Sequence, residues 1–528
     1  MPLSAGNSEG DFRLAQAWLQ GCLHNHATCP KPDLGTPLPT RIIDVGPSNE
    51  SIEPYLLHSN GRKGLYVALS HCWGGKVPLT TTIATLEERT RSIPLRSLQK
   101  TFREAVIVTR RLGVRYLWID SLCILQDSKA DWEKESAVMG DIYASSFLTI
   151  AARGTINSAG GLFIPRELEP PSCRLQYACA KHSLSGSMYI RSPAFQPERL
   201  RNTPLDTRGW VLQERLLSPR ILYFGRHQLY WECAESTFRQ DGKAADVVTD
   251  DLRFGVDFKQ ALDFNSPLPF TDNPTFSRDY RASDLTQFEK GARLLQWYNV
   301  VTEYTIRHLT YQSDKLPAIS GIAKAFQRRT GYTYLAGLWK EDLIAGIAWS
   351  LVQPSDEIIS PTLPSWTWAR LKGKVRFWSK VNGLPLRVLD GSCEVVQVTY
   401  TLAGGHNPYG DIGDAELQVR GRLIEVTYRP SQSPDDEFPT TVFSMSGVPI
   451  GRIRFDLKSS ESQKIRSFFC VLIHGGDNYA AALALESAAD ARLDSYKRIG
   501  YVSVMSDKWE PKGRAAFKEV ASRIISII

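Results

Sequence analysis

Apolar residues in the first third of the chain follow a pattern that predicts alternating strands and helices. The segments 65–70 (LYVALS), 114–120 (VRYLWID) and 147–152 (FLTIAA) are apolar almost throughout, as expected of strands buried on both faces. Residues 98–112 and 131–144 instead carry apolar side chains at helical spacing. Because parallel neighbouring strands need a crossover connection, this order predicts an α/β fold with a doubly wound parallel sheet.

The functional surface is expected where the first two of these strands end, because ligands of doubly wound sheets bind at the carboxyl ends of strands. The candidate ligand-binding residues at these ends are Ser70, His71, Trp73, Gly74, Gly75 and Asp120. The two glycines would let a ligand's phosphate approach the backbone. His71 should point away from Ser70 and Cys72, because consecutive residues of an extended segment face opposite sides. This arrangement argues against a serine or cysteine hydrolase.

The helix predicted over residues 131–144 carries an acidic residue on its apolar side. A helical wheel places Glu135 within a stripe formed by Trp132, Met139, Ile142 and Tyr143. A carboxylate that faces the interior must be hydrogen-bonded, paired with a cation or functional. We place Glu135 in the first turn, where the helix dipole would lower its pKa. It is therefore either a structural capping or ion-pairing residue or a catalytic one, while Ser128 and Asp131 are expected to cap the helix.

The pattern divides the chain into four segments. Residues 1–60 form an N-terminal arm, residues 61–235 the α/β domain, and residues 236–284 a polar insertion without a sustained period. Residues 285–528 form a mixed α+β region that is rich in strands towards its end. Within it, the segment SWTWAR (365–370) predicts a strand whose two tryptophans lie on one face and in the core.

Composition narrows the class of protein. Of the 528 residues, 42% are hydrophobic and 23% are charged, which is ordinary globular usage. The net charge of +7 is spread along the chain without a basic run, so no nucleic-acid partner is predicted. No stretch approaches the ~20 apolar residues of a membrane helix, and the N-terminus lacks the order of a secretory signal. We therefore expect a cytoplasmic protein with reduced thiols.

Three residues near the N-terminus have the spacing of a weak metal site. Cys22, His26 and Cys29 stand at positions i, i+4 and i+7, which is one face of a helix, and would supply three zinc ligands with a fourth from elsewhere. Pro30 limits such a helix, and structural zinc sites usually show four ligands in recognisable pairs. A buried thiol cluster with a surface histidine is the preferred interpretation, so no metal is predicted.

Several ordered motifs resemble the fungal heterokaryon incompatibility (HET) domain family, in its stand-alone form. They are LSHCWGG, the long block from TFREA to SFLTIAA, and RGWVLQERLLSPRILYF followed by WEC. Flanking pieces of the same kind are WLQGCLHNHATC, LPTRIIDV, DKLPAISGIAK, YLAGLW and PSWTWA. The sequence departs conservatively at Glu104, where the family usually has Asp, and at Ser146, where it usually has Ala. On this resemblance, residues 61–235 are the HET domain.

The resemblance implies a role in nonself recognition between fungal strains that ends in programmed cell death. It implies a protein partner encoded by another incompatibility locus and self-association. HET domains are distantly similar to Toll/interleukin-1 receptor (TIR) domains, which have a flavodoxin-like fold, and some of these cleave NAD through a glutamate in a W-x-x-E context. Here that context is Trp132 to Glu135, so Glu135 would be catalytic, Trp132 would belong to the ligand-binding residues and NAD would be a substrate, while no cofactor is indicated.

Under this hypothesis Ser70, Gly74, Gly75 and Asp120 shape the site, and Trp73 offers a ring for stacking. Two alternatives stay open. The first is a non-enzymatic module that signals by self-association or by binding a partner. The second is a protein that retains the fold and serves in a secondary-metabolite gene cluster.

Overall fold

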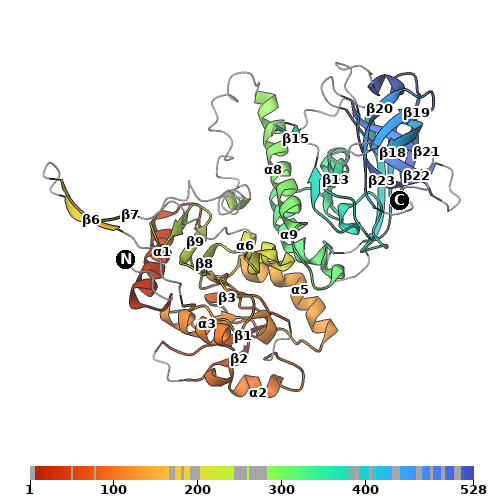
Figure 1. Ribbon diagram of the computed structural model, residues 1–528. Coiled ribbons are helices and arrows are strands. Elements are labelled where there is room, and N and C mark those ends of the chain that lie inside the picture. The colour runs from red at the N-terminus through yellow and green to blue at the C-terminus, as the bar shows by residue number, and fades with distance from the viewer. Residues whose placement is uncertain are drawn as a thin grey trace. The chain divides into compact units, whose positions relative to one another are not determined.

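The computed structural model describes most of the chain, in two compact units formed by residues 1–266 and 267–528 (Figure 1). The described residues are 6–48, 52–75, 79–165, 173–179, 184–190, 203–242, 258–260, 282–377, 380–381, 384–385, 392–402, 408–410, 412–430, 440–458, 467–475, 480–488, 494–504 and 513–528. Most of the predicted insertion 236–284 therefore lies outside them. Each unit is described by itself.

An eight-stranded sheet forms the centre of the first unit. Its order is β10 (Thr237–Arg239), β9 (Leu229–Cys233), β8 (Arg220–Phe224), β5 (Leu148–Ala152), β3 (Tyr66–Ser70), β4 (Tyr116–Trp118), β1 (Arg41–Asp44) and β2 (Tyr55–His58). The four middle strands, β8, β5, β3 and β4, run parallel to one another. The three predicted strands are thus confirmed as parallel neighbours.

The edges of this sheet are antiparallel, so the sheet is mixed rather than wholly parallel. β9 and β10 extend it on one side, and β1 and β2 extend it on the other. The chain passes from β8 to β9 through residues 225–228, and so short a connection permits only an antiparallel hairpin. β1 and β2 come from the first sixty residues, which therefore share the sheet and its core.

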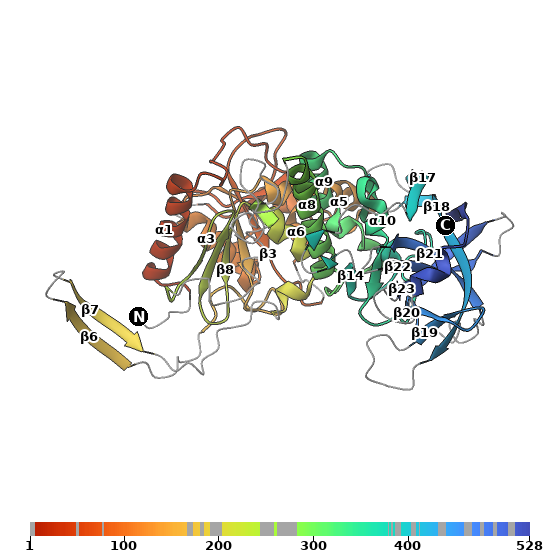
Figure 2. The same ribbon diagram turned by 90° about the horizontal axis from the view of Figure 1, so that it is seen from above.

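Helices cover both faces of the sheet, as Figure 2 shows. The crossovers from β3 to β4 and from β4 to β5 run in opposite directions along the sheet, and right-handed connections then place their helices on opposite faces. On one face, α1 (Glu9–Asn25) and α3 (Lys100–Arg111) are joined by a hydrogen bond of 3.0 Å from Gln16 Nε2 to the Arg111 carbonyl. The opposite face carries α5 (Lys129–Ala144) and α6 (Gly209–Leu217). Two shorter helices of this unit are α2 (Leu86–Arg91) and α4 (Asp120–Cys123).

The helix ends follow local sequence signals. Ser128 is the N-cap of α5 and accepts a hydrogen bond from Asp131 N, which confirms the predicted cap. Ser8 caps α1 in the same way and forms a reciprocal capping box with Asp11. The prediction that Asp120 is the last residue of the second strand is wrong. β4 ends at Trp118, and Asp120 is the first residue of the short helix α4.

The second unit combines helices with a strand-rich sheet. Its main helices are α8 (Ala282–Tyr304), α9 (Pro317–Thr330) and α10 (Leu343–Gly346). Its large sheet contains β17 (Cys393–Leu402), β18 (Ile412–Pro430), β19 (Thr440–Ser444), β20 (Pro449–Phe455), β21 (Ser467–Gly475), β22 (Ala480–Ser487), β23 (Ser495–Val504) and β24 (Ser522–Ile527). Pairing of β18 with β21 closes six of these strands into a ring. The mixed, strand-rich character predicted for this region is confirmed.

The strand predicted for SWTWAR is wrong, although the prediction that its tryptophans are buried is right. Residues Trp368–Arg370 form a 3-10 helix in which the Thr367 side chain accepts a hydrogen bond from Ala369 N. A threonine that bonds to nearby backbone offers the chain an alternative to a strand ladder. Trp366 and Trp368 are both fully buried.

Candidate functional site

Polar side chains gather at the carboxyl ends of β3 and β4, and we name this group the Glu214 cluster. Its members are Ser70, His71, Trp73, Asp120, Tyr143, Arg208 and Glu214. They come from β3, the loop after it, the first residue of α4, the last turns of α5, and α6 with its N-cap. Four of the predicted ligand-binding residues therefore meet in one place.

Glu214 has the most perturbed carboxyl group of this cluster. Its residue is 4% exposed, and burial raises its pKa from 4.5 to about 7. The charge of Arg208 and hydrogen bonding with Ser70 and Tyr143 oppose that rise, while the charge of Asp120 adds to it. Its Oε2 atom makes no hydrogen bond with the described residues. A carboxyl group of this kind exchanges a proton near neutral pH, as a general acid or base must.

Asp120 links the two strand ends. Its Oδ2 accepts a hydrogen bond from Trp73 Nε1 at 2.8 Å, and its Oδ1 lies 3.8 Å from His71 Nδ1. His71 is buried, which lowers its pKa to about 4 against the raising charge of Asp120. The imidazole is therefore neutral at pH 7, and its contact with Asp120 is a polar contact between a neutral ring and a charge.

The arrangement of residues 70–72 does not support nucleophilic hydrolysis. Ser70 interacts with Glu214 on α6, whereas the His71 ring packs edge-on against Phe102 of α3, so the two side chains leave opposite faces of the sheet. This agrees with the alternation expected of an extended segment. Burial raises the pKa of Cys72 to about 11, so its thiol stays protonated at neutral pH.

The two glycines after Trp73 adopt left-handed backbone conformations. Gly74 has φ +70°, and a Cβ atom at this position would lie 2.0 Å from Cβ of Asn157. Gly75 has φ +92°, and a Cβ atom there would meet no atom of the described residues within 4 Å. Gly74 is thus required by close packing against the loop after β5, whereas Gly75 is favoured by its left-handed backbone conformation.

Glu135 lies on the interior side of α5, as the helical wheel indicates, and is 1% exposed. Burial raises its pKa above the ordinary value, although hydrogen bonding with Thr40 and the charge of Arg41 oppose the rise. The expectation that the helix dipole lowers this pKa is wrong. The helix begins at Lys129, so Glu135 lies in its second turn, beyond the reach of the dipole at the first turn.

The surroundings of Glu135 differ from those of the Glu214 cluster. Arg41 of β1 forms an ion pair with Asp131 one turn earlier on α5 and donates to the Cys123 carbonyl at 2.6 Å. Oε1 of Glu135 makes no hydrogen bond with the described residues. Glu135 and Tyr143 lie eight residues apart on one helix, a rise of about 12 Å. Trp132 is half-buried and packs against the core of the unit.

Sequence reasoning missed Tyr143, Arg208 and Glu214 as site residues. In the sequence, Tyr143 belongs only to the apolar stripe of its helix. The available signal for Glu214 is the pair Glu214-Arg215 inside the otherwise apolar run WVLQERLL. Charged residues in a short apolar helix must find partners in the interior.

The spacing of the three candidate metal ligands near the N-terminus predicts one shared helix face, and this prediction is wrong. The α1 helix ends at Asn25, His26 is its C-cap, and Cys29 lies in the turn that follows. The turn nevertheless brings these side chains together, and Cys233 at the end of β9 joins them. Hydrogen bonding from Cys22 and Cys29 lowers the pKa of the Cys233 thiol.

Comparison with known protein families identifies the central part of the first unit. Residues 66–214 match the family model described as Heterokaryon incompatibility protein (HET), which confirms the family that the motifs resemble. No curated protein and no solved structure matches the chain. Within the part of the chain that the structure describes, no helix is both long and apolar enough to cross a membrane.

Proposed function

Because the chain belongs to the heterokaryon incompatibility (HET) family, we propose that it is a cytoplasmic effector of nonself recognition between fungal strains. Engagement of a partner from another incompatibility locus, together with self-association, would switch it on and lead to cell death. The chemistry proposed for this effector is cleavage of NAD at the Glu214 cluster. The observation that carries the proposal is the buried, protonatable carboxyl group of Glu214 at the carboxyl ends of parallel strands.

The strand order supports a nucleotide site at this position. Numbered along the chain, the parallel strands β3, β4, β5 and β8 lie in the order 2-1-3-4, which is the order of flavodoxin-like and TIR-like sheets. In such sheets the ligand binds where the strand order reverses, outside the carboxyl ends of the first and third strands. Here these are β3, which ends at Ser70, and β5, which ends at Ala152.

The side chains suit cleavage of a glycosidic bond to nicotinamide. When the bond between the ribose carbon and the nicotinamide nitrogen breaks, its electron pair leaves with nicotinamide, and the ribose becomes oxocarbenium-like. A carboxylate held in a low-dielectric site stabilises that positive charge, and water then adds to the same carbon and releases a proton. Glu214 would supply the carboxylate, and the half-exposed ring of Trp73 would stack on a base.

Glu135 is the other candidate for this carboxylate. It is buried and incompletely hydrogen-bonded, and its W-x-x-E context supports the assignment. In the described residues, however, its partners are Thr40 and Arg41, whereas Glu214 interacts with Ser70 and Asp120. Contact with the predicted ligand-binding residues therefore favours Glu214.

The test is to incubate the purified full chain with NAD and to follow free nicotinamide. At a pH above the raised pKa of Glu214 we expect Glu214→Gln to reduce release by about 100-fold or more, because the stabilising carboxylate is lost while the shape is kept. Glu135→Gln should keep most of the activity, and Glu133→Gln, on the more exposed side of the same helix, is the matched control. A loss confined to Glu135→Gln would move the chemistry to Glu135, and equal background release from all proteins would reject NAD cleavage.

A toxicity assay separates catalysis from assembly. Overexpressed wild-type chain should arrest growth, and Glu214→Gln should not, although it folds and self-associates normally. If this variant still kills cells, the chain acts as a non-enzymatic signalling module. If neither protein is toxic, a role outside incompatibility, such as service in a secondary-metabolite gene cluster, becomes the better explanation.

A further inference from the structure

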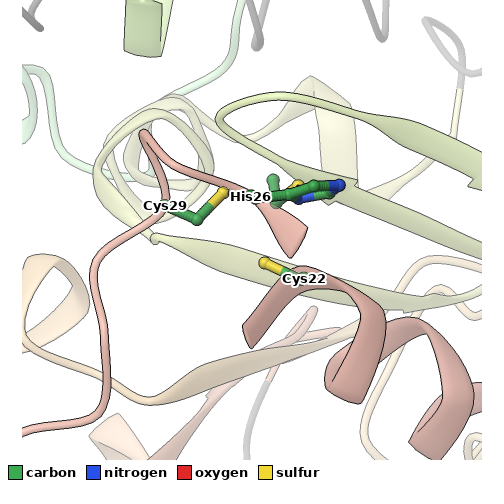
Figure 3. Close-up of side chains that lie close together, drawn as sticks. Cys22, His26 and Cys29 are labelled. Carbon is green, nitrogen blue, oxygen red and sulfur yellow. Dashed lines mark hydrogen bonds between the residues drawn. The ribbon is translucent and has the colours of Figure 1, made fainter. Parts of the chain in front are cut away.

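Four side chains with soft metal-ligand atoms meet near the β9–β10 edge of the sheet in the first unit. None of them belongs to the Glu214 cluster. They are Cys22, His26, Cys29 and Cys233. One ligand atom from each lies within 4.8 Å of the others, and Figure 3 shows that the first three side chains lie close together. Cys22 and Cys233 are fully buried, Cys29 is 2% exposed, and His26 is half-buried.

We propose that these four residues bind a structural Zn²⁺ ion. Three thiolates and one imidazole form the Cys₃His set of closed zinc sites, which leave no position for a substrate. In a tetrahedral site with Zn–S near 2.3 Å and Zn–N near 2.0 Å, ligand sulfur and nitrogen atoms lie about 3.6 Å apart. Nδ1 of His26 lies 3.3 Å from Cys233 Sγ and 3.7 Å from Cys29 Sγ, which brackets that separation.

The nitrogen of His26 that would bind zinc is identified by its contacts. Nδ1 faces the thiols, whereas Nε2 lies 3.3 Å from Ser236 Oγ. A metal-ligating histidine usually donates its other ring N–H to an oxygen, which fixes the tautomer and the ring orientation. Ser236 provides that oxygen. This arrangement is the one expected of a ligand rather than of a surface histidine.

A buried arginine balances the charge of the proposed site. One Zn²⁺ ion with three thiolates and a neutral imidazole carries a net charge of about −1, which is costly to bury alone. Arg220 is 2% exposed, and its Nε lies 3.2 Å from Cys22 Sγ. It is also the strand partner of Cys233 in the β8–β9 pairing. The guanidinium therefore supplies the compensating charge beside the sulfur atoms.

The ligands are held in place by contacts outside the site. Thr28, in the turn between His26 and Cys29, donates from N and Oγ1 to Glu235 Oε1 at 2.5 and 2.9 Å. On α1, the Trp18 ring stacks on Phe238 of β10 with centroids 6.2 Å apart. The site thus joins α1 and the turn after it to the β9–β10 edge, across about two hundred residues of sequence. Its proposed role is to clamp the N-terminal helix to the HET domain.

Metal analysis of the purified full chain tests the proposal. We expect about one zinc per chain in the wild type and at least tenfold less in Cys22→Ser, Cys29→Ser and Cys233→Ser. Cys123→Ser is the matched control, because Cys123 is an equally buried thiol outside the site. His26→Asn should lose zinc, whereas His24→Asn should keep it, since His24 is exposed and its Nδ1 bonds to the Gln20 carbonyl outside the site.

A second measurement uses only the wild-type chain, so its result does not depend on whether the three serine variants fold. Replacement of zinc by Co²⁺ in the wild-type chain should give the visible absorption of a tetrahedral thiolate site, and a chelator should abolish it. A wild-type chain that contains no zinc and binds no cobalt would overturn the proposal. So would a disulfide among Cys22, Cys29 and Cys233, or full zinc content in the three serine variants.

Discussion

Two glutamates of the first unit, Glu214 and Glu232, are almost equally buried but have opposite electrostatic surroundings. Glu232 of β9 is 0% exposed and accepts from Arg215 at 3.0 Å, from Lys259 at 2.8 Å and from Tyr223 at 2.9 Å. Burial raises its pKa, but the charges of Arg215 and Lys259 outweigh burial, and the net shift is downward. Glu214 is 4% exposed, and its pKa rises to about 7.

The comparison shows why burial of a carboxylate does not by itself mark a functional site. The cations and hydroxyl around Glu232 compensate its charge, so it acts as a structural ion-pair residue. Glu214 is next to Arg215 in sequence, but in Glu214 burial outweighs the opposing charge of Arg208. An incompletely compensated acid at the carboxyl edge of a parallel sheet is typical of a site that binds or acts on a ligand.

The largest expected effect comes from Glu232→Gln. Loss of this charge removes the carboxylate that Arg215 and Lys259 share, so the free energy of unfolding should fall by about 3–5 kcal/mol. Chemical denaturation at pH 7 measures it. Because the pKa of Glu232 is lowered in the folded state, the wild-type advantage is present at neutral pH and is lost as the pH falls through the folded-state pKa. A loss below about 1 kcal/mol would contradict the structural role.

The second prediction concerns Glu214→Gln and has the opposite sign. The raised pKa means that wild-type stability declines as the pH rises from 4.5 to about 7, because the folded state holds the proton longer than the unfolded state. A shift of this size corresponds to roughly 3 kcal/mol. The variant should therefore match the wild type below pH 4 and exceed it by up to that amount at pH 8. Parallel pH profiles for the two proteins would contradict the raised pKa.

A smaller effect is expected from Ser70→Ala. Hydrogen bonding with Ser70 lowers the pKa of Glu214, so its removal should move the pH-dependent loss of stability to higher pH. The cost of the lost hydrogen bond should be about 1 kcal/mol. Ser121→Ala is a suitable control, because Ser121 Oγ is buried but makes no hydrogen bond with the described residues. Identical behaviour of the two variants would show that Ser70 does not act on Glu214.

The smallest effect should follow Trp73→Phe. This change removes the hydrogen bond from the indole N–H to Asp120 at the more exposed side of the cluster, at a cost of about 0.5 kcal/mol. Trp132→Phe serves as the comparison, because its indole is half-buried without a hydrogen bond to the described residues. If NAD cleavage is measurable, Trp73→Phe should raise KM more than it lowers kcat. A change in kcat alone would separate Trp73 from ligand binding.

The sequence by itself determined the parts of the protein that depend on local periodicity and on ordered motifs. The buried strands around 65–70 and 147–152, the helix that carries Glu135 inward, and the HET family model that residues 66–214 match could all be predicted from residues close together in the chain. SWTWAR failed because a threonine–backbone hydrogen bond, which leaves no mark on the apolar pattern, replaces the strand by a 3-10 helix.

Only the tertiary structure decided which distant residues meet. Ser70 and Glu214 are separated in the sequence by more than half of the residues of the first unit. They meet because α6 lies against the sheet at the carboxyl end of β3. Cys233 lies about two hundred residues from Cys22, and the β8–β9 hairpin brings it to the last turn of α1. The periodicity of apolar residues predicts which side of a helix or strand is buried. Which residues pack against that side depends on the order of strands in the sheet.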